Sequence, residues 1–490
     1  GESAKQPKDV QRSLQTYGHG PLPTTMSIAL HYNYPVGSNE TEEQEEEKLQ
    51  LCIKSEVLPR ANKILQQVRN GIRNTSFRFL SFEEMPDTVM DNRELRHALF
   101  DLAVSREWDS VAFKRCDDPD FQHLIERCLL MNRARSMDFD VHFGINFSPE
   151  KLGLALRNGL QYTRSLRKLV LGAIRLTEDA AASIADGLAQ CQSLHAMEVI
   201  ATIFETEQVV AHLGRGIEHN GSIHRLTLDG IDECLPILVD CIGRRACPLD
   251  ELHILSESCN SLNSAMEELG AVISNGRVIE MLDLCSRPTQ QTKHGTDKLA
   301  IAPLARALRG EGHKLQALSI TCQRCEPNDQ KLLHRALAYR TSSLQHLGLV
   351  VRDRSCSVQA DFVSFLPSLH LKSLNLGLWR VMHCDEVGGW IRAMSDNYEL
   401  KSVICRPVYI GHMCDEGIRL SFRVMTQRYC RLNRSGRHLF RAGDTIPASL
   451  WPVVLGRINR LHFSDPDFDE DHCKADLIYE FLCNAIPLVL

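Results

Sequence analysis

The chain has 490 residues, with 56 basic and 62 acidic side chains and a formal net charge of −6. Hydrophobic residues make up 43% of the sequence, a fraction typical of soluble globular chains. Since one compact core rarely grows beyond about 300 residues, this length predicts several domains or an elongated repeat array. The mildly acidic total argues against a nucleic-acid-binding protein, which needs a concentrated basic stripe.

Targeting and membrane signals are absent from the printed sequence. No stretch of about 18 apolar residues could span a bilayer, so we expect no membrane partner. The chain starts at Gly1 without an initiator Met or an apolar signal core. We therefore expect the numbering to begin after processing or on a truncated chain.

The 18 cysteines are scattered singly instead of forming a dense disulfide pattern. Cys191, Cys241 and Cys285 stand among apolar neighbours, so we expect them to be small buried hydrophobic residues. This cysteine usage favours a reducing compartment, the cytoplasm or the nucleus.

The N-terminal 76 residues divide into two parts. Residues 1–47 are polar and close on the acidic run Glu40–Glu47, which predicts a solvated disordered arm or, alternatively, an acidic tail that binds a basic partner. In residues 48–76, apolar side chains from Leu49 to Ile72 lie three or four positions apart. This spacing predicts a helix that caps the first structural repeat.

A short pattern, apolar-x-x-apolar-x-apolar, recurs at spacings of 26 to 36 residues, about 29 on average. Its copies begin at Leu166, Leu194, Ile223, Leu249, Ile279, Leu315, Leu344, Leu371 and Leu400. Weaker copies begin at Phe77 and Trp108, with a degenerate unit around Phe139 and Val141. Each copy predicts a short strand, and their number in phase indicates about 12 repeats over residues 77–411.

Helical spacing fills the intervals between these strands. Thr177, followed by Glu178 and Asp179, is a good helix start, and apolar residues then recur on one face up to Leu188. Asn or Gly residues typical of helix ends recur; they stand at His219-Asn220-Gly221, Ser274-Asn275-Gly276 and Gly310-Glu311-Gly312. One such unit cannot bury its apolar face alone, whereas a stack of units forms a continuous core.

These units of 28–29 residues resemble the ribonuclease-inhibitor-like class of leucine-rich repeats. The resemblance implies an α/β horseshoe-shaped solenoid with parallel strands on its concave face and helices on its convex face. The Asn or Cys that the family carries after the third strand residue is missing, since Ile174-Arg175 and Ile231-Asp232 stand there. We therefore expect irregular loops after the strands, with an insertion at Ser286–Lys298 in the longest unit.

Residues 412–490 depart from the repeat pattern. Helical spacing predicts one helix over Asp415–Leu432, another beginning at Pro447 and reaching Ile458, and a third over Lys474–Leu482. A repeat array needs a terminal cap to cover its last apolar face, which favours a helical cap. The alternative is a helical module that recruits an adaptor.

Two segments imitate metal sites. Cys322-x-x-Cys325 would need further ligands from His383, Cys384, His412 or Cys414, and without a second paired motif ordinary free thiols are favoured. The acidic stretch from Asp465 to Asp476 imitates a calcium loop but has Glu470 where the turn needs Gly. Since no phosphate-loop or catalytic motif is present either, we expect no metal, no cofactor and no small-molecule substrate.

The outward strand positions carry a charge pattern. In the resembled fold, the second, third and fifth residues of each strand pattern line the concave face. The charged or polar residues there are the candidate binding residues: Arg167, Lys168, Glu198, Arg225, Asp250, Glu251, His253, Glu280, Asp283, Lys372 and Lys401. Four carboxylates of two adjacent units thus stand between basic residues. The pattern is compatible with a merely solvated sheet face or with recognition of a complementary partner.

The expected function is that of a non-enzymatic scaffold that binds a partner protein through this face. Two alternatives follow from the same scaffold: a GTPase-activating protein or enzyme inhibitor, and a ubiquitin-ligase substrate adaptor. The first alternative is implied by the family resemblance alone. The second requires a ligase-docking motif, and neither residues 48–76 nor residues 412–490 contain a recognisable one.

Overall fold

The computed structural model describes residues 50–54, 79–83, 101, 103–104, 107–114, 121–140, 148–276, 279–287, 298–310, 313–322, 324–338, 343–351, 358–377, 384–405, 416–437, 451–459, 474–475 and 477–479. The chain divides into two compact units, Gly1–Leu249 and Asp250–Leu490. The predicted arm over residues 1–47 lies outside the described residues, as do the insertion residues 288–297 and the acidic stretch 465–473.

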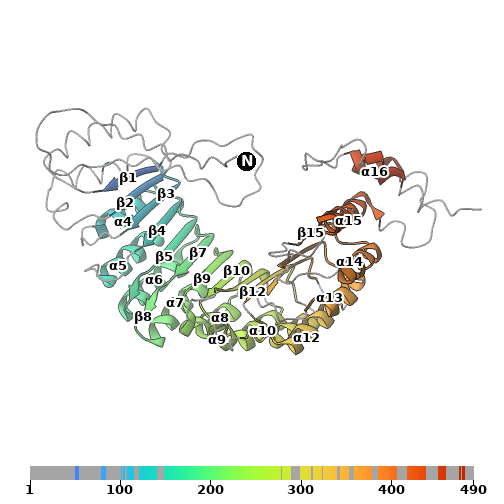
Figure 1. Ribbon diagram of the computed structural model, residues 1–490. Helices are drawn as coiled ribbons and strands as arrows, with labels where there is room; N and C mark the ends of the chain where they lie inside the picture. The colour runs from blue at the N-terminus through green and yellow to red at the C-terminus, as the bar shows by residue number, and fades with distance from the viewer. Residues whose placement is uncertain are drawn as a thin grey trace, which may run out of the picture. The chain divides into compact units, whose positions relative to one another are not determined.

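The first unit is a parallel sheet whose strands follow one another in chain order (Figure 1). Its strands are β1 (Gln50–Lys54), β2 (Phe79–Glu83), β3 (Ser110–Lys114), β4 (Ser136–Asp140), β5 (Lys168–Gly172), β7 (Ala196–Ile200) and β9 (Arg225–Asp229). The described helices are α4 (Phe121–Leu130), α5 (Pro149–Leu160), α6 (Glu178–Gln190), α7 (Glu207–His219) and α8 (Leu235–Arg244), with a 3-10 turn η2 (Asp232–Cys234). Parallel neighbours need a crossover connection, and from β3 onward these helices supply it.

The second unit repeats this arrangement of parallel strands and connecting helices. Its strands are β10 (Leu249–Ser256), which begins at the unit boundary, β11 (Ile279–Ser286), β12 (Ala317–Cys322), β13 (His346–Val351), β14 (Ser373–Gly377) and β15 (Ser402–Cys405). The helices are α9 (Cys259–Ser264), α10 (Met266–Ser274), α11 (Ala302–Arg309), α12 (Pro327–Leu337), α13 (Val358–Phe365), α14 (Cys384–Asp396), α15 (Glu416–Ser435) and α16 (Trp451–Asn459), with a 3-10 turn η4 (Leu366–Ser368). The predicted α/β class with a long parallel sheet is confirmed.

The core lies between the strands and the helices that line one face of them (Figure 1). Alternate strand residues point to this side, and Leu226 and Leu228 of β9 are fully buried there. The helices contribute residues three or four positions apart, such as Leu213 and Ile217 of α7. Strand and helix patterns in the sequence therefore meet in one continuous apolar layer within each unit.

The start of the chain corrects one prediction. The segment predicted as a helix from Leu49 begins instead with strand β1, which pairs in parallel with β2. Leu51 and Ile53 lie two positions apart, and their partners Leu80 and Phe82 show the same alternation. A period of two and a helical period cannot be told apart over so few residues. The remainder of the predicted helix, residues 55–72, lies outside the described residues.

The degenerate unit near Phe139 also has a different register from the one predicted. The buried residues are Ala134, Met137 and Phe139, so the pattern begins at Ala134. Val141 lies outside the described residues. Phe139 stacks on Phe113 of the preceding strand with ring centroids 5.5 Å apart.

The loops that follow β5 and β7 are more regular than expected. Arg175–Leu176 and Ile203–Phe204 form the short parallel strands β6 and β8. Ala173 and Ala201 precede them in left-handed backbone conformation, with φ of 49° and 47°. The amide of Ala173 donates to Ile200 and that of Ala201 to Asp229, each at 2.7 Å. These main-chain bonds join the loops of neighbouring repeat units.

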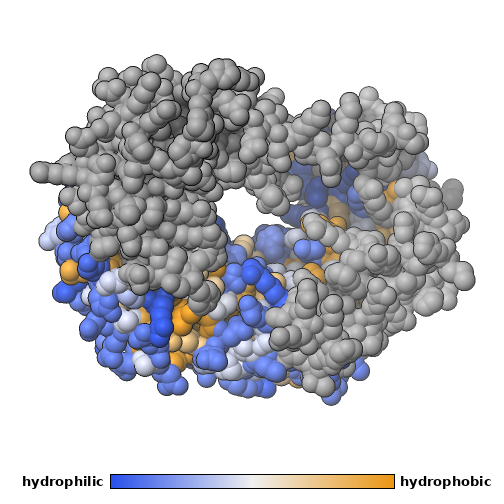
Figure 2. Space-filling view, turned by 60° about the vertical axis from the view of Figure 1, so that its left-hand side comes forward, coloured by the Kyte–Doolittle hydropathy of each residue, from blue (hydrophilic) through white to orange (hydrophobic). Residues whose placement is uncertain are grey.

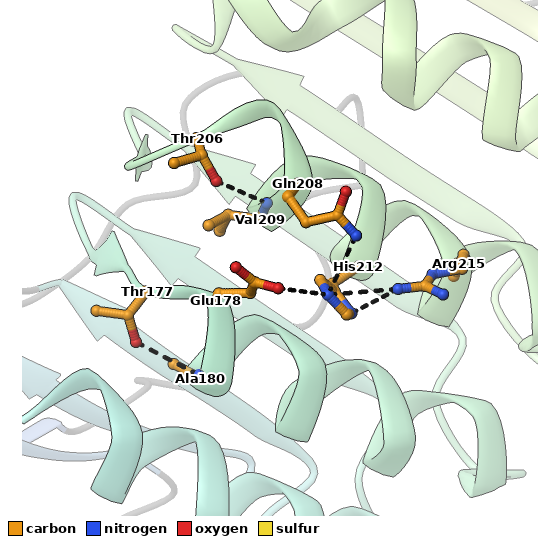
Figure 3. A network of polar contacts seen from close by, with 8 residues as sticks. All are labelled: Thr177, Glu178, Ala180, Thr206, Gln208, Val209, His212 and Arg215. Atoms are coloured by element: carbon orange, nitrogen blue, oxygen red, sulfur yellow. Dashed lines mark hydrogen bonds and ion pairs between the residues drawn. The ribbon is translucent and has the colours of Figure 1, made fainter.

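Helix starts in the first unit follow the sequence signals closely. Thr177 and Thr206 cap α6 and α7, and each hydroxyl accepts a 3.4 Å hydrogen bond from an amide three residues later (Figure 3). Between these helices, His212 Nε2 lies 3.5 Å from Glu178 Oε1, and its Nδ1 lies 2.7 Å from Arg215 (Figure 3). A polar network thus joins neighbouring helices on the side away from the strands.

Buried thiols agree with the sequence interpretation at two of three positions. Cys191 and Cys241 are free and buried. Cys285 is only half-buried, because it follows the buried Leu284 and so lies on the opposite side of β11. Burial raises the pKa of the Cys128 thiol to about 12.

The C-terminal helices lie close to their predicted positions. α15 begins one residue after the predicted start at Asp415 and continues to Ser435. α16 packs on α15 through a buried cluster made of Leu432, Val454, Ile458 and Leu477. Lys474, Ala475 and residues 477–479 are helical as predicted. No helix among the described residues is long and apolar enough to cross a bilayer.

Candidate binding face on the strands

On the described strands, outward side chains alternate with buried leucines; those of β10 and β11 are at least partly exposed, whereas Val170 of β5 is buried. We call this side, which is opposite to the helices, the strand face; its members are the second, third and fifth residues of each strand pattern. In β11 these are Glu280, Met281 and Asp283, between the buried Ile279, Leu282 and Leu284. The surface of the described residues is largely hydrophilic, with hydrophobic residues showing in smaller areas (Figure 2).

In the first unit, two of the predicted residues form an ion pair. Lys168 Nζ on β5 lies 2.8 Å from Glu198 Oε1 on β7. Both side chains are partly exposed to water, so the pair contributes little to stability. It fixes the two charges beside each other on the strand face.

Arg167 and Arg225 lie on the same face, directly before β5 and on β9, with β7 between them. Arg167 donates a hydrogen bond to the main-chain oxygen of Ser193 at 3.2 Å, which holds its guanidinium over the start of β7. The ring of His195 lies edge-on to His224 at 5.7 Å. Arg225 is exposed on β9, where it aligns with Ala196.

The second unit carries the predicted acidic band, defined as Asp250, Glu251, Glu280 and Asp283. His253 joins two of its members. Its Nε2 lies 3.2 Å from Glu251 Oε2 on the same strand, and its Nδ1 lies 3.4 Å from Asp283 Oδ2 on β11. A protonated imidazole can donate to both carboxylates at once.

These contacts change the protonation of the groups involved. The hydrogen bond to Asp283 is the largest influence on His253; burial opposes it, and with the second bond to Glu251 the pKa of His253 is raised. Burial by itself would raise the pKa of Asp283, but hydrogen bonds with His253 and Ser319 and the His253 charge outweigh it, so that pKa is lowered. The pair therefore favours a charged histidine beside a charged aspartate.

Asp250 and Glu280 are the exposed members of the acidic band. They occupy equivalent positions, each directly after the first buried residue of its strand pattern. The structure thus separates the band into an outer pair open to solvent and an inner pair, Glu251 and Asp283, held by His253.

The two predicted lysines of the second unit directly precede its last two strands in the sequence. Lys372 and Lys401 are exposed, and each immediately precedes its strand, β14 or β15. Lys372 Nζ donates to Gln345 Oε1 at 2.7 Å. The amide of Lys401 donates to the carbonyl of Lys372 at 2.8 Å, so the two lysines are direct neighbours.

Two apolar residues on the strand face were left out of the sequence-based site. Met281 of β11 is 38% exposed and Ile404 of β15 is 46% exposed. The signal was present in the sequence, because both occupy outward positions of the strand pattern. The sequence-based site consists of charged residues and His253, although methionine is also enriched at protein interfaces and apolar burial favours association.

The candidate zinc motif consists of buried cysteines. Cys322 and Cys325 are both buried at the helix side of the sheet, while His383, His412 and Cys414 lie outside the described residues. Within the part of the chain that the structure describes, His, Cys, Asp and Glu do not gather in groups of three that could hold a metal ion.

Comparisons with known proteins give no further assignment for this face. No family model matches the sequence. A search of curated proteins found no match to it.

Proposed function

We propose that this chain is a non-enzymatic leucine-rich repeat protein that binds a partner protein through its strand face. In this proposal the two units belong to one horseshoe-shaped solenoid, the strand face is its concave side, and the helices from α15 onward form its C-terminal cap. The repeated strand pattern and the parallel order of strands within each unit support it.

The observation that carries the proposal is the exposed charge on β10 and β11. Asp250 and Glu280 are open to solvent on the strand face, and Met281 stands exposed beside them. A rigid sheet presents these groups in fixed positions, which lowers the entropy cost of binding. Their charge favours a partner with basic residues.

Two further observations support a binding role over catalysis. Burial raises the pKa of Cys128 to about 12 and that of Cys430 to about 11, so these thiols stay protonated and are poor nucleophiles. The ionisable pair His253 and Asp283 faces a further carboxylate, Glu251, where a catalytic pair would need a nucleophile. Free thiols such as Cys191 suit a reducing compartment.

The test is quantitative affinity purification from native lysate with a surface-charge variant. Asp250→Lys with Glu280→Lys reverses the exposed pair and leaves the contacts of His253 in place. The control is Glu267→Lys with Asp396→Lys, which makes the same charge change at exposed positions on helices α10 and α14. Circular dichroism and urea unfolding check that all three proteins fold alike.

We expect one or more partners to be retained by the wild type and the control and lost from the strand-face variant. If the variant keeps every partner, the band is only solvated surface. If the wild type retains no partner, the binding proposal itself fails.

A further inference from the structure

Charge on the strand face of the second unit is sorted by strand. The acidic band lies on β10 and β11, while Lys372 and Lys401 precede β14 and β15. The strands between them, β12 and β13, carry no carboxylate, lysine or arginine at the matching outward positions, which are Gln316, Ala317, Ser319, Gln345, His346 and Gly348. The face therefore has an acidic end, a middle of histidine, amide and small side chains, and a basic end.

Main-chain hydrogen bonds show that these ends belong to one continuous row. The amide of Gln316 donates to Glu280, that of Gln345 to Gln316, that of Lys372 to Gln345, and that of Lys401 to Lys372, at 2.7 to 2.8 Å. Each bond is one step between neighbouring strands, which is about 4.8 Å. Glu280 and Lys401 are four steps apart, so their main chains stand about 19 Å apart along the row.

An exposed apolar side chain accompanies each end. Met281, 38% exposed, stands next to Glu280, and Ile404, 46% exposed, lies on β15 after Lys401. Side chains in the middle of the face project only a short way from the sheet, because Gly348 has no side chain and the residue aligned with it is Ser319. A partner can thus approach the middle closely and contact an apolar residue at either end.

The width of the acidic end indicates the shape of that partner. Glu280 and Asp283 are three residues apart on β11, about 10 Å. This matches the diameter of an α-helix with its side chains, about 10–12 Å, and is twice the spacing of one added extended strand. The distance of about 19 Å between the ends corresponds to about 13 helical residues.

From these observations we infer that the second unit binds an amphipathic α-helix lying across its strands. The helix carries basic and apolar residues over β10 and β11 and acidic and apolar residues over β14 and β15. Opposite charges orient the helix, and Met281 and Ile404 supply apolar contact. The inference rests on the proposed function and specifies the chemistry of the partner.

The probe is a pair of fluorescein-labelled, alanine-based helical peptides of about 21 residues with identical composition. One has Glu and Leu in its first two turns, Ala and Gln in the middle, and Lys and Leu in its last two turns, an order that also favours the helix dipole. The other alternates the same charges along its length. Fluorescence anisotropy measures binding to the full chain at low salt.

We expect the sorted peptide to bind at least tenfold more tightly than the alternated one. Asp250→Lys with Glu280→Lys, and separately Lys372→Glu with Lys401→Glu, each lower that affinity at least tenfold. The first of these variants instead prefers a peptide with Glu at both ends. Met281→Ser with Ile404→Ser weakens binding while the dependence on salt stays the same.

Equal binding of the sorted and alternated peptides, or no binding of either, overturns the inference. So does an equal loss in the helix-side control, Glu267→Lys with Asp396→Lys, because only net charge would then matter. If the native partner is lost from the Asp250 and Glu280 variant while the peptides are not discriminated, the proposed function stands and the inference of a charge-sorted helix falls.

Discussion

The side-chain amide of Asn433 donates a 3.0 Å hydrogen bond to the main-chain oxygen of Asn397, and Asn397 makes the same kind of bond to Leu369 at 3.0 Å. Each amide also bonds a second carbonyl, Leu400 for Asn433 and Leu366 for Asn397. Asn433 is the third residue from the end of α15. Asn433 therefore joins the end of α15 to the turn after α14, just as Asn397 joins the end of α14 to the turn around Leu369.

The arrangement recurs because helix ends leave main-chain carbonyls without partners. Asn220, at the end of α7, donates to Leu188 and Cys191 at 2.6 and 2.9 Å. Its side-chain oxygen accepts from the amides of Ser222 and Ile223. One buried asparagine thus satisfies four main-chain groups of two successive turns.

Replacing such an asparagine leaves these groups unsatisfied in the interior. We predict that Asn397→Ala lowers the free energy of unfolding by about 2–4 kcal/mol, because a buried group that loses its partner costs about 1–3 kcal/mol. Urea unfolding measures the change. The exposed Asn260 serves as the control, since Asn260→Ala should alter stability by less than about 0.5 kcal/mol. Equal effects at the two positions would contradict the assigned role.

Close packing of helices α6 and α7 depends on Gly216. A Cβ added there would lie 2.6 Å from the main-chain Cα of Ala185, so the helices would have to separate. We predict that Gly216→Ala destabilises by about 2 kcal/mol or more, although alanine favours a helix by about 1 kcal/mol. At Gly388 a Cβ meets nothing within 4 Å, and Gly388→Ala should stabilise by about 0.5–1 kcal/mol. Thermal unfolding of both variants tests the opposite signs.

Much of this fold could be predicted from short-range pattern. Leu282 and Leu284 predict β11 because burial alternates along a strand, and Asn220 marks the end of α7 as expected. Strand β1 was not predicted because the local spacing is ambiguous. Leu51 and Ile53 are two residues apart, as in a strand, while Ile53 and Val57 are four apart, as in a helix. Pairing with β2, which the sequence does not display, decides between the two.

The hydrogen-bond partners of polar side chains that are distant in the sequence could not be predicted from it. Arg245 is buried, and its guanidinium donates to the main-chain oxygens of Ile217 and Ile223. Nothing in the local sequence distinguishes it from the exposed Arg244 beside it. On the candidate site, the outward positions could be predicted from alternation, whereas the link from His253 to Asp283 depends on the register of two strands.

The left-handed alanines after β5 and β7 are strained positions. Ala173 and Ala201 have positive φ, and Gly230 occupies the corresponding place after β9 with φ of 64°. We predict that Ala201→Gly stabilises by about 0.5–1 kcal/mol, because relief of the left-handed strain of about 1–2 kcal/mol exceeds the entropy cost of glycine.

The reverse change is the matched comparison. A Cβ at Gly230 would have its nearest neighbour, Ala201 Cα, at 3.5 Å, so there is room for it and only the backbone conformation opposes it. Gly230→Ala should destabilise by about 1 kcal/mol. Urea midpoints that move in the same direction for both variants would rule out backbone strain as the cause.

The bond between His253 and Asp283 makes stability depend on pH. The pKa of His253 is raised in the folded chain, so its contribution is complete below the unfolded value near 6.5 and is lost as pH rises through the folded pKa. The pKa of Asp283 is lowered, so its contribution is present above about 4 and is lost as pH falls through the folded pKa. The pair should therefore stabilise most between about pH 4 and 6.5.

NMR titration of the His253 ring tests the origin of this effect. Because the hydrogen bond to Asp283 is its largest cause, Asp283→Asn should lower the pKa of His253 more than Glu251→Gln does. In an otherwise wild-type chain, His253→Gln should lower the free energy of unfolding more at pH 6 than at pH 9. In a chain that carries Asp283→Asn and Glu251→Gln, the effect of His253→Gln should be the same at both pH values. A pKa of His253 that stays unchanged in Asp283→Asn would show that the contact across β10 and β11 does not hold the proton.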